Sequence, residues 1–478
     1  MKHFTPLALA MAVSGCMSLA PKYERPAAPV ASQFPVPPTP DGAAPVSAAT
    51  TEAASSIAWQ RFFADQRLQQ LIALSLQNNR DLRVAILNIE QARATYRIRR
   101  ADLLPTVGLG ASGQVQPGPD VYQAGVRISS FELDFFGRVR SLSNAAQAQF
   151  LATEEARKTT QISLISQVAT TYLAYQADEE LLALTRQTLK TREDSLGLTQ
   201  LKYDNGIVSK LDLDQSLSLV ETAKVVLAQQ LRQRAQDANL LTLLVGGPIP
   251  DTLPAGVPLA ETRLAELPPG LPSDLLAVRP DIRSAEQQLL AANANIGAAR
   301  ANFFPNISLT GTGGSASSAL GDLFKGGSYG FTFAPSIFLP IFDYGRNKAN
   351  LDSSVAGRDI AVAQYEKSIQ TAFREVADAL AGQSTYTEEL RAQIAVAQSE
   401  TNRFNLSDLR YRSGAASYLD LLDAQRSLFE AQRASVGANL ARLQNQVTLY
   451  RVLGGGWTIP ATATTAANAA TTTNPSRQ

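Results

Sequence analysis

Two stretches of the chain place apolar residues at helical spacing over unusual lengths. Residues 138–203 and 346–412 contain no proline, and each predicts one continuous helix, roughly 100 Å long at ~1.5 Å per residue. The segments that follow keep heptad-like spacing, as in Leu213, Leu217 and Val220 after the first helix and Leu443 and Val447 after the second. Heptad spacing favours coiled-coil pairing. The sequence therefore predicts two long helical hairpins.

A segment in which apolar residues alternate with small or polar ones precedes each long helix. This period-two pattern predicts strand hairpins at about 106–133 and about 306–339. Leu109 and Val126 fall on the apolar face of the first hairpin, and Phe331 and Phe333 on that of the second. Tilted strands of about ten residues can span a bilayer, but an antiparallel sheet with one wet face alternates in the same way. The strands alone leave both alternatives open.

The number of predicted strands limits the membrane alternative. Four strands are too few for a transmembrane barrel, which needs about eight, and an open sheet edge cannot lie in hydrocarbon. If the strands are embedded in a membrane, several copies of the chain must therefore share one barrel. No stretch of about 18 apolar residues occurs after the N-terminal leader, so a membrane-spanning helix is not predicted.

The two halves of the chain are repeats of each other. Residues 201–213 and 409–421 are identical at seven of thirteen positions, at an offset of 208, and both contain a glycine turn, Gly206 or Gly414. Phe136-Gly137-Arg138 matches Tyr344-Gly345-Arg346 at the same offset, whereas Leu103-Leu104-Pro105 matches Phe303-Phe304-Pro305 at 200. The eight extra residues of the second repeat therefore fall in its strand hairpin.

These patterns predict an order of segments. Helices at Trp59–Asn78 and Asp81–Leu104 precede the first strand hairpin. Gly137 and Gly345, followed by Arg138 and Arg346, mark the elbows where strands turn into helices. The predicted segments are a signal peptide at 1–15, a Pro/Ala-rich extended spacer at 16–56, the first repeat at 57–246 with its turn at 204–210, a proline-rich linker at 247–273, the second repeat at 274–456 with its turn at 413–417, and a flexible tail at 457–478.

The N-terminus has the layout of a bacterial lipoprotein signal. Lys2 precedes a short apolar run that ends in Val13-Ser14-Gly15-Cys16, a lipobox. We expect Cys16 to become the first mature residue and to carry the acyl chains, palmitate among them; a signal peptide that merely contains a cysteine is the alternative. Met17 after it favours sorting to the outer membrane.

The amino-acid composition argues against enzymatic activity and metal binding in this chain. Cys16 is the only cysteine and His3, within the signal, the only histidine, so the mature chain lacks Ser-His and Cys-His pairs and histidine or thiolate metal sites. We therefore expect no enzyme activity, no cofactor and no metal. Loss of Lys2 leaves 42 basic and 42 acidic residues without charge runs, which makes nucleic acid an improbable partner.

One segment carries a family resemblance. Gly270-Leu-Pro-Ser-Asp-Leu-Leu-Ala-Val-Arg-Pro-Asp-Ile-Arg-Ser-Ala-Glu286, which continues through Asn293 and Gly297 to Phe303-Phe304-Pro305, resembles the outer-membrane efflux factors, the TolC-like family, in its lipoprotein branch. The match extends from Cys16 to about Gly456. It implies a mainly helical fold with transmembrane strands, in which a homotrimer closes a twelve-stranded β-barrel in the outer membrane above a periplasmic α-barrel.

The same resemblance implies a function and partners. The trimer would be a passive conduit for multidrug efflux, working with a periplasmic adaptor and an inner-membrane pump of the resistance-nodulation-division class, with outer-membrane lipid around its barrel. Its periplasmic mouth would be held shut by side chains near the helix-to-helix turns. The residues that fit these gate positions are Arg410, Tyr411, Asp423, Tyr203 and, from the first repeat, either Asp212 or Asp214.

Other interpretations remain. Asp212 and Asp420 each stand three residues after a serine, so both are also candidate helix caps. The whole chain is compatible with a lipid-anchored periplasmic coiled-coil spacer that conducts nothing, or with a lipoprotein hydrolase whose base is a lysine or a carboxylate. Neither of these alternatives accounts for the paired strand hairpins.

Overall fold

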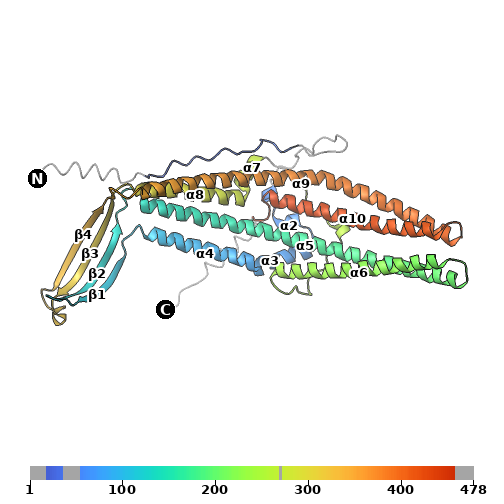
Figure 1. The fold of residues 1–478 in the computed structure, drawn as a ribbon, viewed down its shortest axis with the longest axis horizontal. Coiled ribbons are helices and arrows are strands. Elements are labelled where there is room, and N and C mark those ends of the chain that lie inside the picture. The colour runs from blue at the N-terminus through green and yellow to red at the C-terminus, as the bar shows by residue number, and fades with distance from the viewer. Residues whose placement is uncertain (1–17, 36–53, 268–271, 458–478) are drawn as a thin grey trace, which may run out of the picture. The chain divides into compact units, whose positions relative to one another are not determined.

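The structure is a computed structural model that describes residues 18–35, 54–267 and 272–457. The predicted signal peptide, Cys16 and almost all of the predicted tail lie outside these residues. The chain is mainly helical with one small sheet (Figure 1). Its helices are α2 (Trp59–Phe62), α3 (Gln66–Asn78), α4 (Arg80–Ala101), α5 (Arg138–Asp204), α6 (Lys210–Val245), α7 (Pro272–Val278), α8 (Pro280–Ala301), α9 (Arg346–Arg412) and α10 (Tyr418–Val452).

Four strands form one antiparallel sheet in the order β1-β2-β3-β4, with β1 (Val107–Gln114) and β4 (Tyr329–Phe338) at its edges. The inner strands are β2 (Val121–Glu132) and β3 (Asn306–Ser317), so the central pairing joins the two repeats (Figure 1). The length difference between the repeats lies in the second hairpin, where β3 is longer than β1 and a short 3₁₀ helix, η4 (Leu320–Asp322), precedes β4.

The strand register gathers the apolar residues on one face. Leu109 lies opposite Val126, Val126 opposite Gly313, and Gly313 opposite Phe331, so these positions share a face of the sheet. A bulge after Ile128, with Ser130 at a φ of 46°, shifts the register and brings Phe131 opposite Leu309 on that same face. The bulge thus keeps Phe131 on the apolar face, although the period-two alternation of the sequence breaks after Ile128.

The helices fall into two compact units, and neither unit is a sequence repeat. Of the described residues, unit 1 contains 18–29, 85–157 and 281–369, and therefore α8, the sheet and the first parts of α5 and α9. Unit 2 contains the other described residues, up to 457, and therefore the helix-to-helix turns. Each unit takes segments from both repeats. Within the described residues, we find no helix that combines the length and apolarity needed to cross a membrane.

Unit 2 has an aromatic and polar core that the sequence did not reveal. Phe62 stacks on Tyr450 with ring centroids 4.1 Å apart, and the Tyr450 hydroxyl donates to the Ile57 carbonyl at 2.6 Å. Arg279 pairs with Glu375 at 2.9 Å and donates to the Val452 carbonyl. The core therefore joins the end of α10 to segments that lie far from it in sequence.

The structure corrects two predictions about the N-terminal part. The helix predicted over Trp59–Asn78 is interrupted after α2, because Asp65 caps α3 and accepts hydrogen bonds from the Arg67 and Leu68 amides. Of the predicted spacer the structure describes residues 18–35 and 54–56, and those that belong to unit 1 do not stand apart from the fold. Arg25 makes a bidentate ion pair with Glu286 of α8, and the Pro21 carbonyl accepts from Asn293.

Candidate functional site

The two helix-to-helix turns of unit 2 share one backbone design. Gly206 and Gly414 follow the long helices α5 and α9 with φ angles of 71° and 77°, in the left-handed region that favours glycine. Ile207 N donates to Lys202 O at 2.9 Å, and Ala415 N donates to Arg410 O at 2.8 Å. These bonds close the last turn of each long helix in the way that a left-handed glycine allows.

Matching serine and aspartate residues begin both return helices. The Ser209 hydroxyl accepts from the Asp212 amide while the Asp212 carboxylate accepts from the Ser209 amide at 3.0 Å, and Ser417 and Asp420 do the same in the second repeat. These are complete capping boxes, each satisfying two backbone donors. The capping role predicted as one alternative for Asp212 and Asp420 is confirmed.

A buried cluster joins the two turns. It comprises Leu219 from α6, Tyr411 from α9, and Tyr418, Leu421 and Leu422 from α10. The rings of Tyr411 and Tyr418 lie 5.6 Å apart, and the Lys202 ammonium of α5 stands 4.0 Å from the centre of the Tyr411 ring. Four helices therefore meet here, and Figure 1 shows both turns at the same end of unit 2. A cation over an aromatic face stabilises this junction.

The five predicted gate residues occupy different environments. Tyr411 is only 6% exposed and its hydroxyl has no hydrogen-bond partner among the described residues, whereas Tyr203 is 38% exposed. Arg410 is exposed and its guanidinium forms no ion pair with a described residue. Asp214, the alternative to Asp212, pairs with Lys210 at 2.8 Å.

Asp423 has a partner that the sequence analysis missed. Its carboxylate accepts from Arg403 at 2.8 Å, and Arg403 also binds Glu400 at 2.7 Å. The hydrogen bond to Asp423 raises the pKa of Arg403 above its ordinary value. Within one chain, therefore, Arg403 rather than Arg410 holds Asp423. Arg403 stands two helical turns before Arg410, outside the repeated motif, so the repeat gave no signal for it.

A buried arginine lies farther up the same helices. Arg192 of α5 donates to the Leu219 carbonyl at 3.1 Å, and its guanidinium stands 5.4 Å from the Phe429 ring, which Arg433 approaches at 5.6 Å. No carboxylate among the described residues pairs with Arg192, and burial lowers its pKa. Arg192 of α5 is thus linked to α6 by its hydrogen bond to the Leu219 carbonyl and to α10 by its contact with the Phe429 ring.

A pair of carboxyl groups joins α5 to α6. Asp178 is buried beside Asp237, and burial, followed by the charge and hydrogen bond of Asp237, raises the pKa of Asp178 to about 7. The nearby Arg234 does not neutralise this pair, because it binds Glu179 and donates to the Tyr175 hydroxyl at 3.0 Å. Asp178 Oδ2 has no hydrogen-bond partner among the described residues, so protonation of Asp178 relieves the cost of a buried charge beside Asp237.

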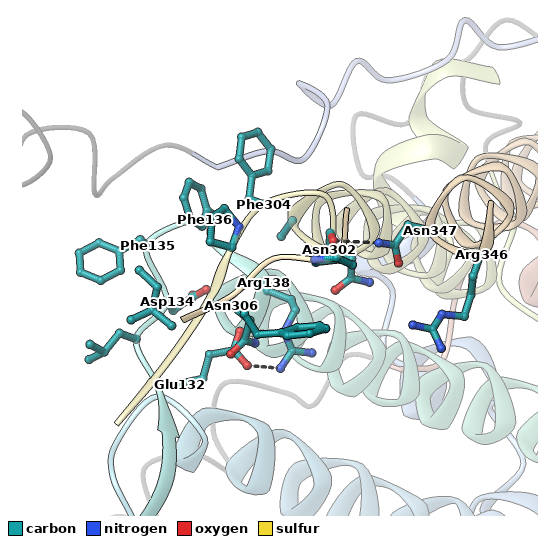
Figure 2. Close-up of a pocket in the computed structure, with 16 residues that line it drawn as sticks. Glu132, Asp134, Phe135, Phe136, Arg138, Asn302, Phe304, Asn306, Arg346 and Asn347 are labelled. Atoms are coloured by element: carbon teal, nitrogen blue, oxygen red, sulfur yellow. Dashed lines mark hydrogen bonds and ion pairs between the residues drawn. The ribbon is translucent and has the colours of Figure 1, made fainter. Parts of the chain in front are cut away.

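The two strand-to-helix elbows of unit 1 differ in their charge pairing. At the first, Glu132 binds Arg138 at 2.8 Å and Asp134 binds Arg140 at 3.2 Å, and Figure 2 shows the first pair. At the second, Asp343 accepts from the Gly345 and Asn347 amides at the start of α9, and Arg346 has no ion pair with a described residue.

The predicted elbow glycines have positive φ angles, 75° at Gly137 and 81° at Gly345. A cavity of about 180 Å³ lies at the elbows. It is lined by Phe136 and Phe304, whose rings stack 4.7 Å apart, and by Asn302, Arg138 and Arg346 (Figure 2). Glu132 and Asp134, both ion-paired with arginines, also line it. Among the described residues, no group of three His, Cys, Asp or Glu side chains is placed to hold a metal ion.

The chain is similar to outer membrane efflux proteins over nearly its whole length. The profile of the family "Outer membrane efflux protein" matches residues 71–247 and 271–455. The probable efflux pump outer membrane protein TtgC of Pseudomonas putida is 48% identical over 468 residues, which cover 95% of this chain and 96% of that protein. Outer membrane protein OprJ of Pseudomonas aeruginosa is 44% identical over 467 residues, covering 94% and 95%.

Solved structures agree with these sequence comparisons. The open state of the Neisseria gonorrhoeae MtrE outer membrane channel superposes with a TM-score of 0.85 at 39% identity, covering 92% of this chain and 99% of that one. A structure of CusC superposes with a TM-score of 0.82 at 38% identity, covering 92% and 100%. The residues that match the family profile, 71–247 and 271–455, include both helical hairpins and the sheet. The chain therefore belongs to the outer membrane efflux protein family, as the segment from Gly270 to Pro305 predicted.

Proposed function

We propose that three copies of this chain form one efflux channel, in which their sheets close a twelve-stranded barrel in the outer membrane and their long helices form a periplasmic tunnel. One observation carries the proposal: the apolar face of the sheet is exposed, with Leu109 at 88% and Phe331 at 84%. Side chains of this kind on one sheet face suit contact with lipid. The edge strands β1 and β4 would then find partners in neighbouring copies, since hydrocarbon tolerates no open edge.

The paired turns are our candidate for the periplasmic gate. Arg410 and Tyr203 are exposed there, Asp212 lies in the first turn of α6, and Asp423 is held by Arg403. Exposed ion pairs each contribute about 0–1 kcal/mol. A ring of such weak contacts repeated in three copies can hold a mouth closed and still release it. Tyr411 would stabilise the positions of the exposed gate residues by packing in the buried cluster.

The remaining parts of the proposal concern the anchor and the partners. The acyl chains on Cys16 would hold the N-terminus at the outer membrane, and the segment from Leu19 to Arg25, bound along α8, would continue from that anchor. A periplasmic adaptor and an inner-membrane pump would deliver solutes to the gate and supply the energy. The channel itself would perform no chemistry and hold no cofactor.

Single-channel conductance in planar bilayers tests this function. We expect the purified mature protein to give small, flickering currents, and we expect the Arg410→Ala, Asp423→Asn double variant to give several-fold larger ones. Lys210→Ala is the matched control, because it removes an equally exposed ion pair from the first turn.

The outcomes separate the alternatives. Large currents in the parent and in both variants would support a channel and reject this gate. Larger currents after Lys210→Ala than after the double variant would place the gate in the first turn. An absence of current from every protein, despite verified insertion, would favour the lipid-anchored spacer.

A further inference from the structure

The buried face of α10 changes character along the helix. Leu421 near the turn and Leu443 toward the other end are at most 1% exposed, so both ends of this face pack as an apolar core. Between them, Gln425, Phe429 and Arg433 recur at steps of four, which places all three on one side of the helix. We call these three residues the α10 insert. It puts two polar side chains where α10 runs beside α5 (Figure 1).

The contact between the α10 insert and α5 leaves polar atoms without hydrogen bonds. The Gln425 amide donates to the Ser195 hydroxyl at 3.2 Å, but its Oε1 is buried and has no partner among the described residues. Arg192 is 4% exposed and stands 5.4 Å from the Phe429 ring. Its Nε, like that of Arg433, is buried with no described partner. Two hairpins therefore close here over groups that they do not satisfy.

The unsatisfied groups make this contact weak. A buried polar atom that lacks a partner has given up its hydrogen bonds to water, and a buried cation without a carboxylate has given up its hydration. Burial also lowers the pKa of Arg192, because the charged form is disfavoured there. Both costs disappear as soon as water reaches the groups. The two helices are thus held together less firmly at the insert than at the apolar ends of the face.

The insert is not a general requirement of these helical hairpins. At the 208-residue offset, Leu217 and Val225 of α6 take the places of Gln425 and Arg433. Another amide of α10 also contacts α5, but Gln444 donates its hydrogen bond to the Thr170 carbonyl at 3.3 Å. The unsatisfied polar atoms are therefore particular to one part of one hairpin, which calls for a reason other than the backbone design.

We infer that Arg192 and Gln425 are positioning residues of the gate, because the α10 insert keeps the contact with α5 weak enough for α10 to separate from α5 there when the channel opens. The inference rests on the proposed function, since it requires a channel that opens at the paired turns. Asp423 stands two residues before Gln425 on α10, so separation at the insert displaces a candidate gate residue. The apolar end of α10 around Leu443 stays packed.

Replacing the polar atoms by apolar ones of similar size tests this inference. In the Arg192→Met, Gln425→Leu double variant, we expect the thermal midpoint to rise and the ratio of open to closed dwell times in planar bilayers to fall about tenfold, as relief of one unsatisfied buried group predicts. Residues that merely hold the fold together would lower the midpoint when replaced. Gln444→Leu is the matched control, because it removes a satisfied contact between the same two helices, and it should leave the dwell-time ratio unchanged.

The outcomes of this experiment are distinct. An absence of current from the parent protein would defeat the proposed function and this inference with it. Current from the parent with an unchanged ratio in the double variant would leave the channel standing and overturn the role of the insert. A lower midpoint in the double variant would show that Arg192 and Gln425 stabilise the contact, which also overturns the inference.

A second measurement does not depend on the apolar variant. Gln425 is 6% exposed, so Gln425→Cys should react slowly with a water-soluble maleimide while the mouth is closed. We expect the reaction to be several-fold faster when Arg410→Ala and Asp423→Asn are added, once their larger current has been verified. Val447→Cys, at a fully buried position of the same helix, is the control and should react slowly in both backgrounds, with the parent protein as the baseline for Cys16. Equal rates at position 425 in the two backgrounds would overturn the inference.

Discussion

The helical hairpin α5–α6 and the helical hairpin α9–α10 have the same backbone design but different side-chain chemistry. Both turn at a left-handed glycine and restart with a Ser-Asp capping box. At the 208-residue offset, however, Tyr203 corresponds to Tyr411, Arg192 to Glu400, and Asp178 to Tyr386. The first tyrosine is exposed and the second is buried.

This difference separates two kinds of constraint. The positions that the repeats share, such as Gly206 and Gly414, are those where the backbone itself needs a particular residue. Where side chains of the two hairpins meet, identical residues can have different environments, as the two tyrosines do, and other positions have diverged. Among the candidate gate residues, Arg410 and Asp423 differ from their counterparts Lys202 and Gln215, whereas Tyr203 and Asp212 match theirs.

The largest contrast is expected between the two tyrosines. Tyr411→Ala empties part of the buried cluster and should destabilise unit 2 by about 3 kcal/mol, whereas Tyr203→Ala should cost below about 0.5 kcal/mol. The thermal midpoint, followed by helical circular dichroism of the protein in detergent, measures both. Tyr411→Phe is the control and should be nearly neutral, since the hydroxyl has no partner among the described residues. Equal costs at both positions would remove the asymmetry.

The second contrast concerns pH. Because the pKa of Asp178 is about 7 in the folded chain and near 3.8 otherwise, the folded state binds the extra proton, and stability should fall as pH rises from about 4 through 7. Asp178→Asn, which stays neutral throughout, should remove on the order of 2 kcal/mol of this fall in stability across the range. Tyr386→Phe, at the equivalent place in α9, should leave the slope unchanged. Melting curves across this pH range would contradict the assignment if both variants keep the parent slope.

The two capping boxes are expected to contribute equally to the stability of their helices. Ser209→Ala and Ser417→Ala each remove one cap and should each cost about 1 kcal/mol. Their thermal midpoints should fall by similar amounts, and Ser218→Ala, within α6 and outside the caps, serves as the control. Midpoints that differ widely between the two cap variants would show that the surroundings, rather than the caps, set the stability of each turn.

The smallest effect is expected from the exposed ion pairs. Arg403→Ala and Lys210→Ala should each change stability by below about 0.5 kcal/mol, because water and salt screen both pairs. Their effects on conductance should nevertheless differ, with larger currents after Arg403→Ala alone, since only Arg403 holds Asp423. Identical conductance would argue against a gate in the second turn.

The long helices and strands could be predicted from sequence because their patterns are local. The predicted ranges 138–203 and 346–412 agree with α5 and α9 to within one residue, since caps and left-handed glycines mark helix ends directly. The break between α2 and α3 was missed because apolar spacing continues across it, and the Asp65 cap was overlooked. The apolar sheet face was found by alternation, but the bulge at Ser130 leaves no such signal.

The side-chain pairings of the turns could not be read from sequence. Asp423 lies 20 residues from Arg403, and only the antiparallel return of α10 along α9 brings them together. Likewise, Asp178 and Asp237 lie on successive helices, where periodicity predicts which face is apolar but not which polar groups are enclosed. The sequence indicates which residue types can form a gate, but not which side chains pair with them. The pairing depends on the register between neighbouring helices.

The pairing of β2 with β3 sets an order of events for this chain during its biogenesis. Tyr122 lies opposite Ser317, so the centre of the sheet joins positions about 200 residues apart, and each compact unit needs both halves of the sequence. The loop that must close is long, and contacts of such high sequence separation form slowly. The first half can build helices as it emerges from the export machinery, yet it cannot complete a unit by itself. An exported chain must remain unassembled, with its apolar strands in need of protection, until its last third has arrived.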